Sequence, residues 1–195
     1  MDILVRILKV IFSLIFIRLG ILFGVALLLL LAWAGAEGVY YFHGRPADLA
    51  AMASQGNVDL ATSSGSLTQL NQALGTPNKP VRNNTAANAD LYSWYHDEAV
   101  RALVLDGTPV SITIGDISRL RLLPYRRPVF PGSFLGLRIG APPPSAAQAA
   151  DIQARATACC NAKSLTWDVK QGRISEIRYE RDGYEYRYVG PAKGG

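Results

Sequence analysis

One long apolar run near the N-terminus constrains this chain more than any other feature. The segment LGILFGVALLLLLAWA (residues 19–34) carries no charge, and the apolar character continues to Phe42 with Glu37 as the single exception. A helix needs roughly 20 apolar residues to cross the hydrocarbon layer of a bilayer. The sequence therefore predicts a transmembrane helix, with residues 1–42 forming a membrane anchor that contacts lipid.

The residues that flank this run predict its orientation. Three basic side chains precede it, namely Arg6, Lys9 and Arg18. The positive-inside rule then places the N-terminus in the cytoplasm. Aromatic side chains fall where the helix would reach the opposite interface, at Trp33, Tyr40 and Tyr41. We expect a single-pass protein of the inner (cytoplasmic) membrane whose larger C-terminal part is extracytoplasmic, and periplasmic in a Gram-negative cell.

A cleaved signal peptide is the main alternative to this anchor. Ala32-Trp33-Ala34 has the small-x-small form of a cleavage site. The apolar span is longer than a typical signal-peptide core, which favours a retained anchor. Residues 3–17 are compatible with an amphipathic helix in the interface that precedes the span.

The remaining part of the 195-residue chain is long enough to bury one core of useful size. The net charge of +5 is smaller than expected for a general nucleic-acid binder, which presents lysines and aromatics along one face. We therefore expect no nucleic-acid partner.

Three regions are predicted along the chain. Residues 1–42 form the anchor, residues 43–65 a tether, and residues 66–190 an extracytoplasmic domain. Within the tether, Pro46 begins a short helix that runs to Met52, because proline suits the first helical turn. The polar segment 61–66 then predicts a flexible joint.

The domain contains two blocks of similar order, residues 66–115 and 132–190. In the first, Ser66 and Gln69 form a capping box that opens a helix, and Gly75 ends it. Strand-like segments follow, with a tight turn predicted at Asp106-Gly107.

The second block opens with another capping box, at Ser145 and Gln148, directly after three prolines. Its helix has Ala149, Ile152, Ala156 and Cys159 on the apolar face. Turns at Gln171-Gly172 and Asp182-Gly183 separate three further strands, the last over residues 184–189. We expect an α+β fold of two units, each a helix followed by a three-stranded antiparallel meander.

These blocks carry a family resemblance. The order LGLRIGAPPPSAAQ, a helix, Trp167 in a strand and then VKQGRISEI resembles the helix-plus-meander repeat of the SmpA/OmlA and β-lactamase-inhibitor-protein-like families. LNQALGTP, LYSWY and AVRALVLDGTPVSI in the first block are similar. The resemblance implies an envelope protein that binds other proteins without catalysis. This chain departs from the lipoprotein members because it has a helical anchor.

Catalytic chemistry has few candidates in this sequence. His96 lies beside two carboxylates in WYHDEA, which suits a general base or a metal ligand, but a polar turn is the simpler interpretation. HExxH, GxSxG, P-loop and GxGxxG motifs are absent from the sequence. We therefore predict a protein that is not an enzyme and that uses no cofactor or metal.

An arginine-rich segment is the best candidate for a binding surface. Its members are Arg121, Tyr125, Arg126, Arg127 and Arg138. Arginine and tyrosine are enriched among the residues that dominate protein interfaces, and proline rigidity lowers the ordering cost of a loop. Anionic lipid headgroups and a solvated loop remain as alternatives.

The two cysteines, Cys159 and Cys160, are neighbours. In an extracytoplasmic domain they would lie in an oxidising compartment. Three alternatives are open: two buried thiols at the end of the helix, a vicinal disulfide, or a disulfide to another chain. Asn161 would tolerate the backbone distortion that a vicinal disulfide requires.

Together these features predict a membrane-anchored, non-enzymatic protein-binding domain that contacts another envelope protein. An assembly or secretion accessory and an immunity-type inhibitor both fit. The alternatives are a small envelope hydrolase or metal protein that uses His96, and a structural subunit that acts through its N-terminal helix. The sequence names neither the partner nor the oligomeric state.

Overall fold

The computed structural model of the chain describes residues 2–55, 57–82, 89–96, 98–115 and 128–183. It divides into two compact units, Met1–His43 with Leu120–Tyr125, and Gly44–Arg119 with Arg126–Gly195. The first unit contains α1 (Asp2–Val39), which continues into a short π-helix, η1 (Tyr40–Gly44). One helix is long and apolar enough to cross a membrane by length and composition, a test that a signal sequence would also pass.

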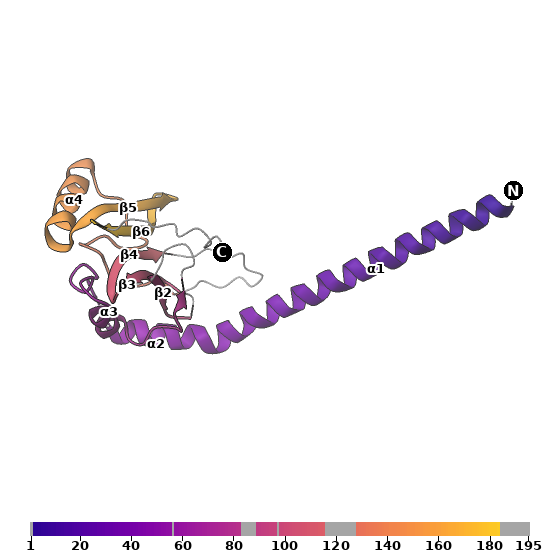
Figure 1. The fold of residues 1–195 in the computed structure, drawn as a ribbon, viewed down its shortest axis with the longest axis horizontal. Helices are drawn as coiled ribbons and strands as arrows, with labels where there is room; N and C mark the ends of the chain where they lie inside the picture. The colour runs from indigo at the N-terminus through magenta and orange to yellow at the C-terminus, as the bar shows by residue number, and fades with distance from the viewer. Residues whose placement is uncertain (1, 56, 83–88, 97, 116–127, 184–195) are drawn as a thin grey trace, which may run out of the picture. The chain divides into compact units, whose positions relative to one another are not determined.

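The second unit is an α+β domain, as expected (Figure 1). Its helices are α2 (Arg45–Gln55), α3 (Leu67–Leu74) and α4 (Ala146–Cys160). Its described strands are β1 (Val81–Arg82), β2 (Ala89–Trp94), β3 (Val100–Leu105), β4 (Thr108–Gly115), β5 (Ala162–Lys170) and β6 (Arg173–Arg181). They form one antiparallel sheet in the order β1-β2-β3-β4-β6-β5.

Two predicted turns have the backbone that tight hairpins require. Asp106 and Gly107 have φ values of 49° and 78°, and Gln171 and Gly172 have values of 51° and 71°. Positive φ at both central residues matches the right-handed twist of the strands that such turns connect. The turns set the register of the β3–β4 and β5–β6 hairpins, which the sequence predicted.

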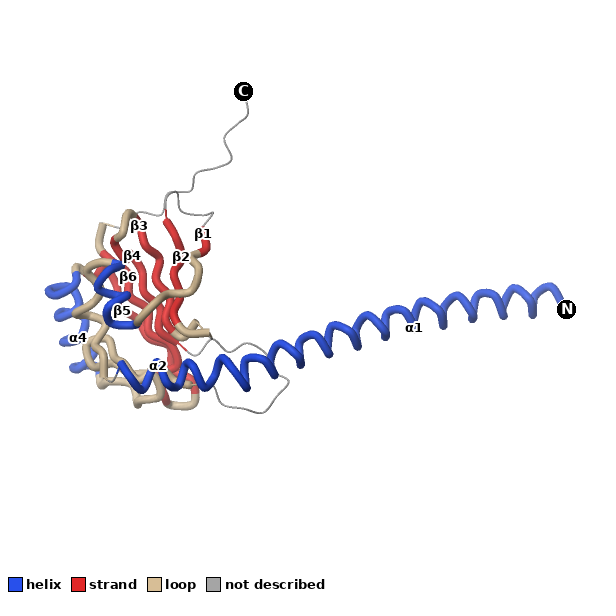
Figure 2. Tube along the Cα trace, turned by 90° about the horizontal axis from the view of Figure 1, so that it is seen from below, coloured by secondary structure: helices blue, strands red, loops and turns tan. Residues whose placement is uncertain are grey.

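The core lies between the sheet and the helices, and Figure 2 shows α4 on one side of the strands. β3 alternates between buried and half-buried residues along its length, as a strand with one covered face should. The largest side chains that are fully buried are Trp94, Tyr179 and Phe134. The Trp94 indole nitrogen donates a hydrogen bond to Gly75 O at 3.1 Å, which ties β2 to the end of α3.

The segment expected to be a tether, residues 43–65, contributes to this core. Met52 and Leu60 are only 4% and 0% exposed. Leu60 N donates to Ser133 O and Ser133 N donates to Val58 O, both at 2.8 Å, so the segment pairs with a distant loop. A Cβ on Gly132 would lie 2.7 Å from Val58 O, so glycine is needed at this approach. The expected joint is thus a packed turn.

The two blocks do not form separate layers. β4 of the first pairs with β6 of the second, so both contribute to one sheet. The third strand predicted for the second block, residues 184–189, lies outside the described residues. The strand-like pattern near Phe134 is instead a tight turn, in which Phe134 and Leu137 exchange two hydrogen bonds of 3.0 Å around Leu135 (φ 52°) and Gly136 (φ 85°).

Candidate functional site

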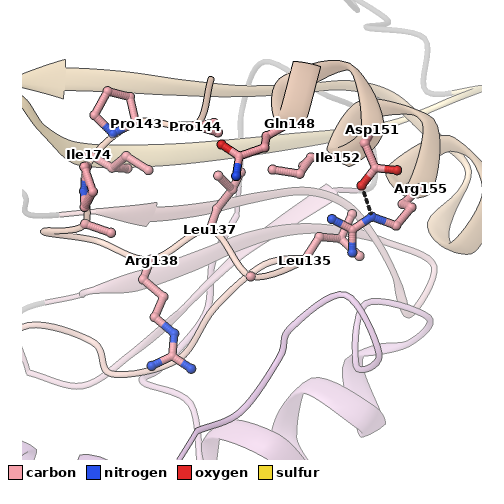
Figure 3. A pocket seen from close by; sticks show the side chains of 13 residues that line it. Leu135, Leu137, Arg138, Pro143, Pro144, Gln148, Asp151, Ile152, Arg155 and Ile174 are labelled. Atoms are coloured by element: carbon pink, nitrogen blue, oxygen red, sulfur yellow. Dashed lines mark ion pairs between the residues drawn. The ribbon is translucent and has the colours of Figure 1, made fainter. Parts of the chain in front are cut away.

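A groove of about 490 Å³ lies between the loop of residues 135–144 and α4 (Figure 3). Its floor is apolar, because Leu137, Ile152 and Ile174 point into it and are themselves 4%, 7% and 2% exposed. Pro142, Pro143 and Pro144 line another part of the wall. The volume falls in the range that holds a small molecule or a few side chains of a partner.

Hydrogen bonds to β6 fix the loop that borders this groove. Gly140 N donates to Ile174 O at 2.7 Å, and Ile174 N donates to Ala141 O at 2.8 Å. The Arg173 guanidinium adds a bond from Nη1 to Gly140 O at 2.8 Å. The prolines then lead directly to the capping box of Ser145 and Gln148 that opens α4. The wall is therefore held on both sides.

Two kinds of charge stand at the rim of the groove. Asp151 and Arg155 form an ion pair of 2.9 Å one helical turn apart, and both side chains are more than half exposed. Figure 3 shows Arg138 extending away from that pair. Arg138 is exposed and makes no ion pair with any residue that the structure describes. It therefore offers a guanidinium to a ligand.

Arg138 is the one member of the predicted binding cluster that the structure places. Arg121, Tyr125, Arg126 and Arg127 lie outside the described residues. The groove beside Arg138 was not expected, since Leu137 and Ile174 are far apart in the sequence and only the pairing around Gly140 brings them together.

His96 has a partner that the sequence did not reveal. Asp48, in α2, is 2% exposed, and its Oδ1 accepts bonds from His96 N and pairs with His96 Nδ1, both at 2.9 Å. Tyr95 and Glu98 have φ values of 69° and 58°, so the turn around His96 uses left-handed backbone. A buried carboxylate that accepts a backbone N–H holds such a turn in place.

The His96 ring itself is 59% exposed. Over the described part of the chain, no group of three or more His, Cys, Asp or Glu side chains could hold a metal ion. The geometry gives Asp48 a structural role in joining α2 to the turn.

The cysteine pair ends α4. Cys159 and Cys160 are joined by a disulfide between neighbouring residues, and Asn161 follows in the left-handed conformation (φ 58°, ψ 42°). The predicted apolar face of the helix is wrong by one residue, because Ile152, Ala156 and Cys160 are buried whereas Cys159 is exposed. The spacing of four residues follows the helical period more closely than the predicted step from Ala156 to Cys159.

Tyr179 holds this helix end from the sheet. Its hydroxyl donates to Cys160 O at 2.6 Å, and its side chain is 1% exposed. Burial raises the pKa of the Tyr179 phenol above its usual value, and the positive charge of Arg181 opposes that change.

A second cavity, of about 370 Å³, borders the cysteines. Asp59 and Arg181 contribute opposite charges to its lining, and Thr62, Ser64 and Gln69 contribute polar groups.

The predicted membrane-interface residues lie in α1 and η1. Arg6, Lys9 and Arg18 belong to α1, and the Arg18 side chain is exposed. Trp33 and Tyr40 are half-buried, and the Tyr41 ring packs edge-on against Phe42 with a centroid separation of 5.2 Å.

Comparisons with known proteins give little. No model of a known protein family matches the sequence, and no curated protein matches it. A solved structure of an extracellular protein containing a SCP domain from Bacillus anthracis str. Ames is similar with a TM-score of 0.33 and 14% sequence identity. The likeness covers 71% of this chain and 52% of that chain, so it spans about half of the solved structure. The resemblance to the SmpA/OmlA and β-lactamase-inhibitor-protein-like families stays a prediction.

Proposed function

We propose that the chain is a membrane-anchored, non-enzymatic domain that binds another envelope protein through the groove beside Arg138. One observation carries the proposal: an apolar floor and an arginine without an ion-pair partner among the described residues lie at one rigid depression. The matching ligand is an apolar segment of a protein that carries an acidic residue.

The physical properties of the groove suit a protein ligand. Arginine is enriched among the residues that dominate interface energies, because its planar group binds carboxylates with two hydrogen bonds. Hydrogen bonds to β6 and three successive prolines fix the loop, so little conformational entropy is lost when a partner binds. A floor already formed by Leu137, Ile152 and Ile174 needs no rearrangement.

The membrane part of the proposal rests on α1. Its apolar length fits a span, and the basic residues Arg6, Lys9 and Arg18 favour a cytoplasmic N-terminus. The domain would then work outside the cytoplasm as an assembly or secretion accessory, or as an immunity-type inhibitor. The remaining predicted cluster, Arg121, Tyr125, Arg126 and Arg127, would extend the same interface, and the two blocks would be copies of one helix-plus-meander unit.

Co-purification of crosslinked partners from membranes tests this proposal. Arg138→Glu places a negative charge where a carboxylate should bind, so we expect it to remove the specific partner. Lys163→Glu is a matched control, because Lys163 is exposed on β5 and does not line the groove. Equal recovery with both variants would contradict the proposal.

A second experiment separates the groove from the anchor. Residues 1–41 are replaced by an unrelated transmembrane helix. Retained partner binding supports the groove, whereas loss of binding with this exchange favours a structural subunit that acts through its N-terminal helix.

A further inference from the structure

The disulfide between Cys159 and Cys160 lies at the wall of the 370 Å³ cavity, together with Asp59, Thr62, Ser64 and Arg181. None of these groups is needed for the groove described above. A cavity of this size accommodates a small molecule, and its lining combines a reactive bond with opposite charges.

The two sulfur atoms differ in access. Cys159 is exposed, whereas Cys160 is 6% exposed and packs in the core. Thiol–disulfide exchange depends on which sulfur an attacking thiolate can reach. The cavity therefore directs attack to Cys159, with Cys160 as the leaving sulfur.

Acceptors for the reduced state are already in place. Cys160 Sγ lies 3.4 Å from Ala61 O, so a Cys160 thiol can donate to that carbonyl. Cys159 Sγ lies 3.9 Å from Ala156 O, within reach of a second weak bond. Tyr179 holds the Cys160 carbonyl through the backbone, so opening the sulfur bridge leaves this tie intact.

We propose that this cavity is a thiol-exchange site for small zwitterionic thiols of the amino-acid or peptide type. The thiol loses its proton and attacks Cys159 Sγ, which forms a mixed disulfide. The Cys159–Cys160 bond breaks, and Cys160 Sγ leaves with the electron pair and takes up a proton. A second thiol then attacks the sulfur of the bound thiol and releases Cys159. In total, two thiols are oxidised to a disulfide and the cysteine pair gains two electrons and two protons.

Charge in the cavity selects the class of thiol. Arg181 can pair with the carboxylate of such a ligand, and it makes no ion pair within the described residues. Asp59 uses Oδ1 to accept bonds from Ala61 N at 3.1 Å and Leu135 N at 3.0 Å. Its negative charge is available to the ammonium group of the ligand.

The test uses the full-length protein in detergent micelles with L-cysteine and 2-mercaptoethanol as probes. Mixed disulfides are trapped by acid and alkylation, and peptide mass spectrometry locates them. We expect no free thiol before the probe is added, and a first adduct on Cys159. Free thiols at the start, or a first adduct on Cys160, would overturn the proposal.

A pair of variants tests the choice of ligand. Arg181→Gln should lower the rate with L-cysteine by about three- to fivefold, the range for one exposed ion pair, and leave the rate with 2-mercaptoethanol unchanged. Arg178→Gln is the control, because Arg178 lies on the same strand and does not line the cavity. Equal effects of Arg181→Gln on both probes would refute selection by charge.

Discussion

Asp48 joins two parts of the second unit through a single carboxylate. It is buried in α2 and accepts hydrogen bonds from the backbone and the ring of His96. A buried backbone donor that loses its acceptor costs more than an exposed ring that loses a contact. The carboxylate should therefore matter more to stability than the histidine.

For Asp48→Ala we expect the free energy of unfolding to fall by about 1–3 kcal/mol, because His96 N is left unsatisfied. Asp48→Asn keeps an oxygen acceptor and should lose less. His96→Ala should lose under about 1 kcal/mol, since the pair is largely exposed on the histidine side. Urea unfolding of the full chain, followed by the fluorescence of buried Trp94, measures all three. A larger loss for His96→Ala than for Asp48→Ala would contradict this role.

Tyr179 makes the stability depend on alkaline pH. Burial raises its pKa in the folded protein, so the neutral phenol is favoured there over the ionised form. The unfolded chain loses this proton near pH about 10, so the stability contributed by Tyr179 is present below that pH and declines as pH rises through the folded pKa.

Tyr179→Phe removes this dependence together with the bond to Cys160 O. At neutral pH we expect the variant to be less stable by about 0.5–1.5 kcal/mol. The difference between the two proteins should shrink as the pH is raised beyond about 10. Denaturant titrations at several pH values test this, and a difference that stays constant would show that Tyr179 does not titrate as described.

At the scale of elements, α4 is defined by its two ends. Ser145 and Gln148 complete the capping box, with Ser145 N donating to Gln148 Oε1 at 2.9 Å. Asn161 ends the helix in the left-handed conformation. Both signals are local, which is why the sequence alone predicted where this helix begins and ends.

We expect Ser145→Ala to destabilise the protein by about 0.5–2 kcal/mol, because it leaves a helix N–H without its acceptor. Asn161→Val should destabilise it too, since a β-branched residue is strained at φ 58°, whereas Asn161→Gly should be tolerated. Thermal unfolding monitored by circular dichroism compares the three. A Gly variant as unstable as the Val variant would show that the left-handed cap is not the cause.

At the scale of the whole molecule, long-range pairing decided what the sequence could not. The hairpin turns and helix caps depend on adjacent residues and were predictable. The burial of residues 43–65, the bridge between Asp59 and Ser133, and the groove floor depend on segments that meet only after folding. Polar residues in segment 61–66 favoured a joint, because nothing local indicates that Leu60 fills a site beside Ser133.

The packed segment yields a matched pair of substitutions within α2. Met52 is 4% exposed and Leu49 is 44% exposed. Met52→Ala should lower the free energy of unfolding by about 2–5 kcal/mol, because it leaves a cavity in the core. Leu49→Ala should change it by about 0.5 kcal/mol or less. Similar effects of the two substitutions would mean that α2 is not part of the domain core.

Site-specific photocrosslinking tests the central claim, that the groove beside Arg138 binds a protein partner. A photoreactive phenylalanine analogue replaces Gln148, which lines the groove, or Thr166, which is exposed on β5 away from it, in full-length protein in its own membrane. We expect one discrete crosslinked product from position 148, its loss when Arg138→Glu is added, and no such product from position 166. The same products from both positions, or a product from position 148 that Arg138→Glu leaves unchanged, would contradict the claim.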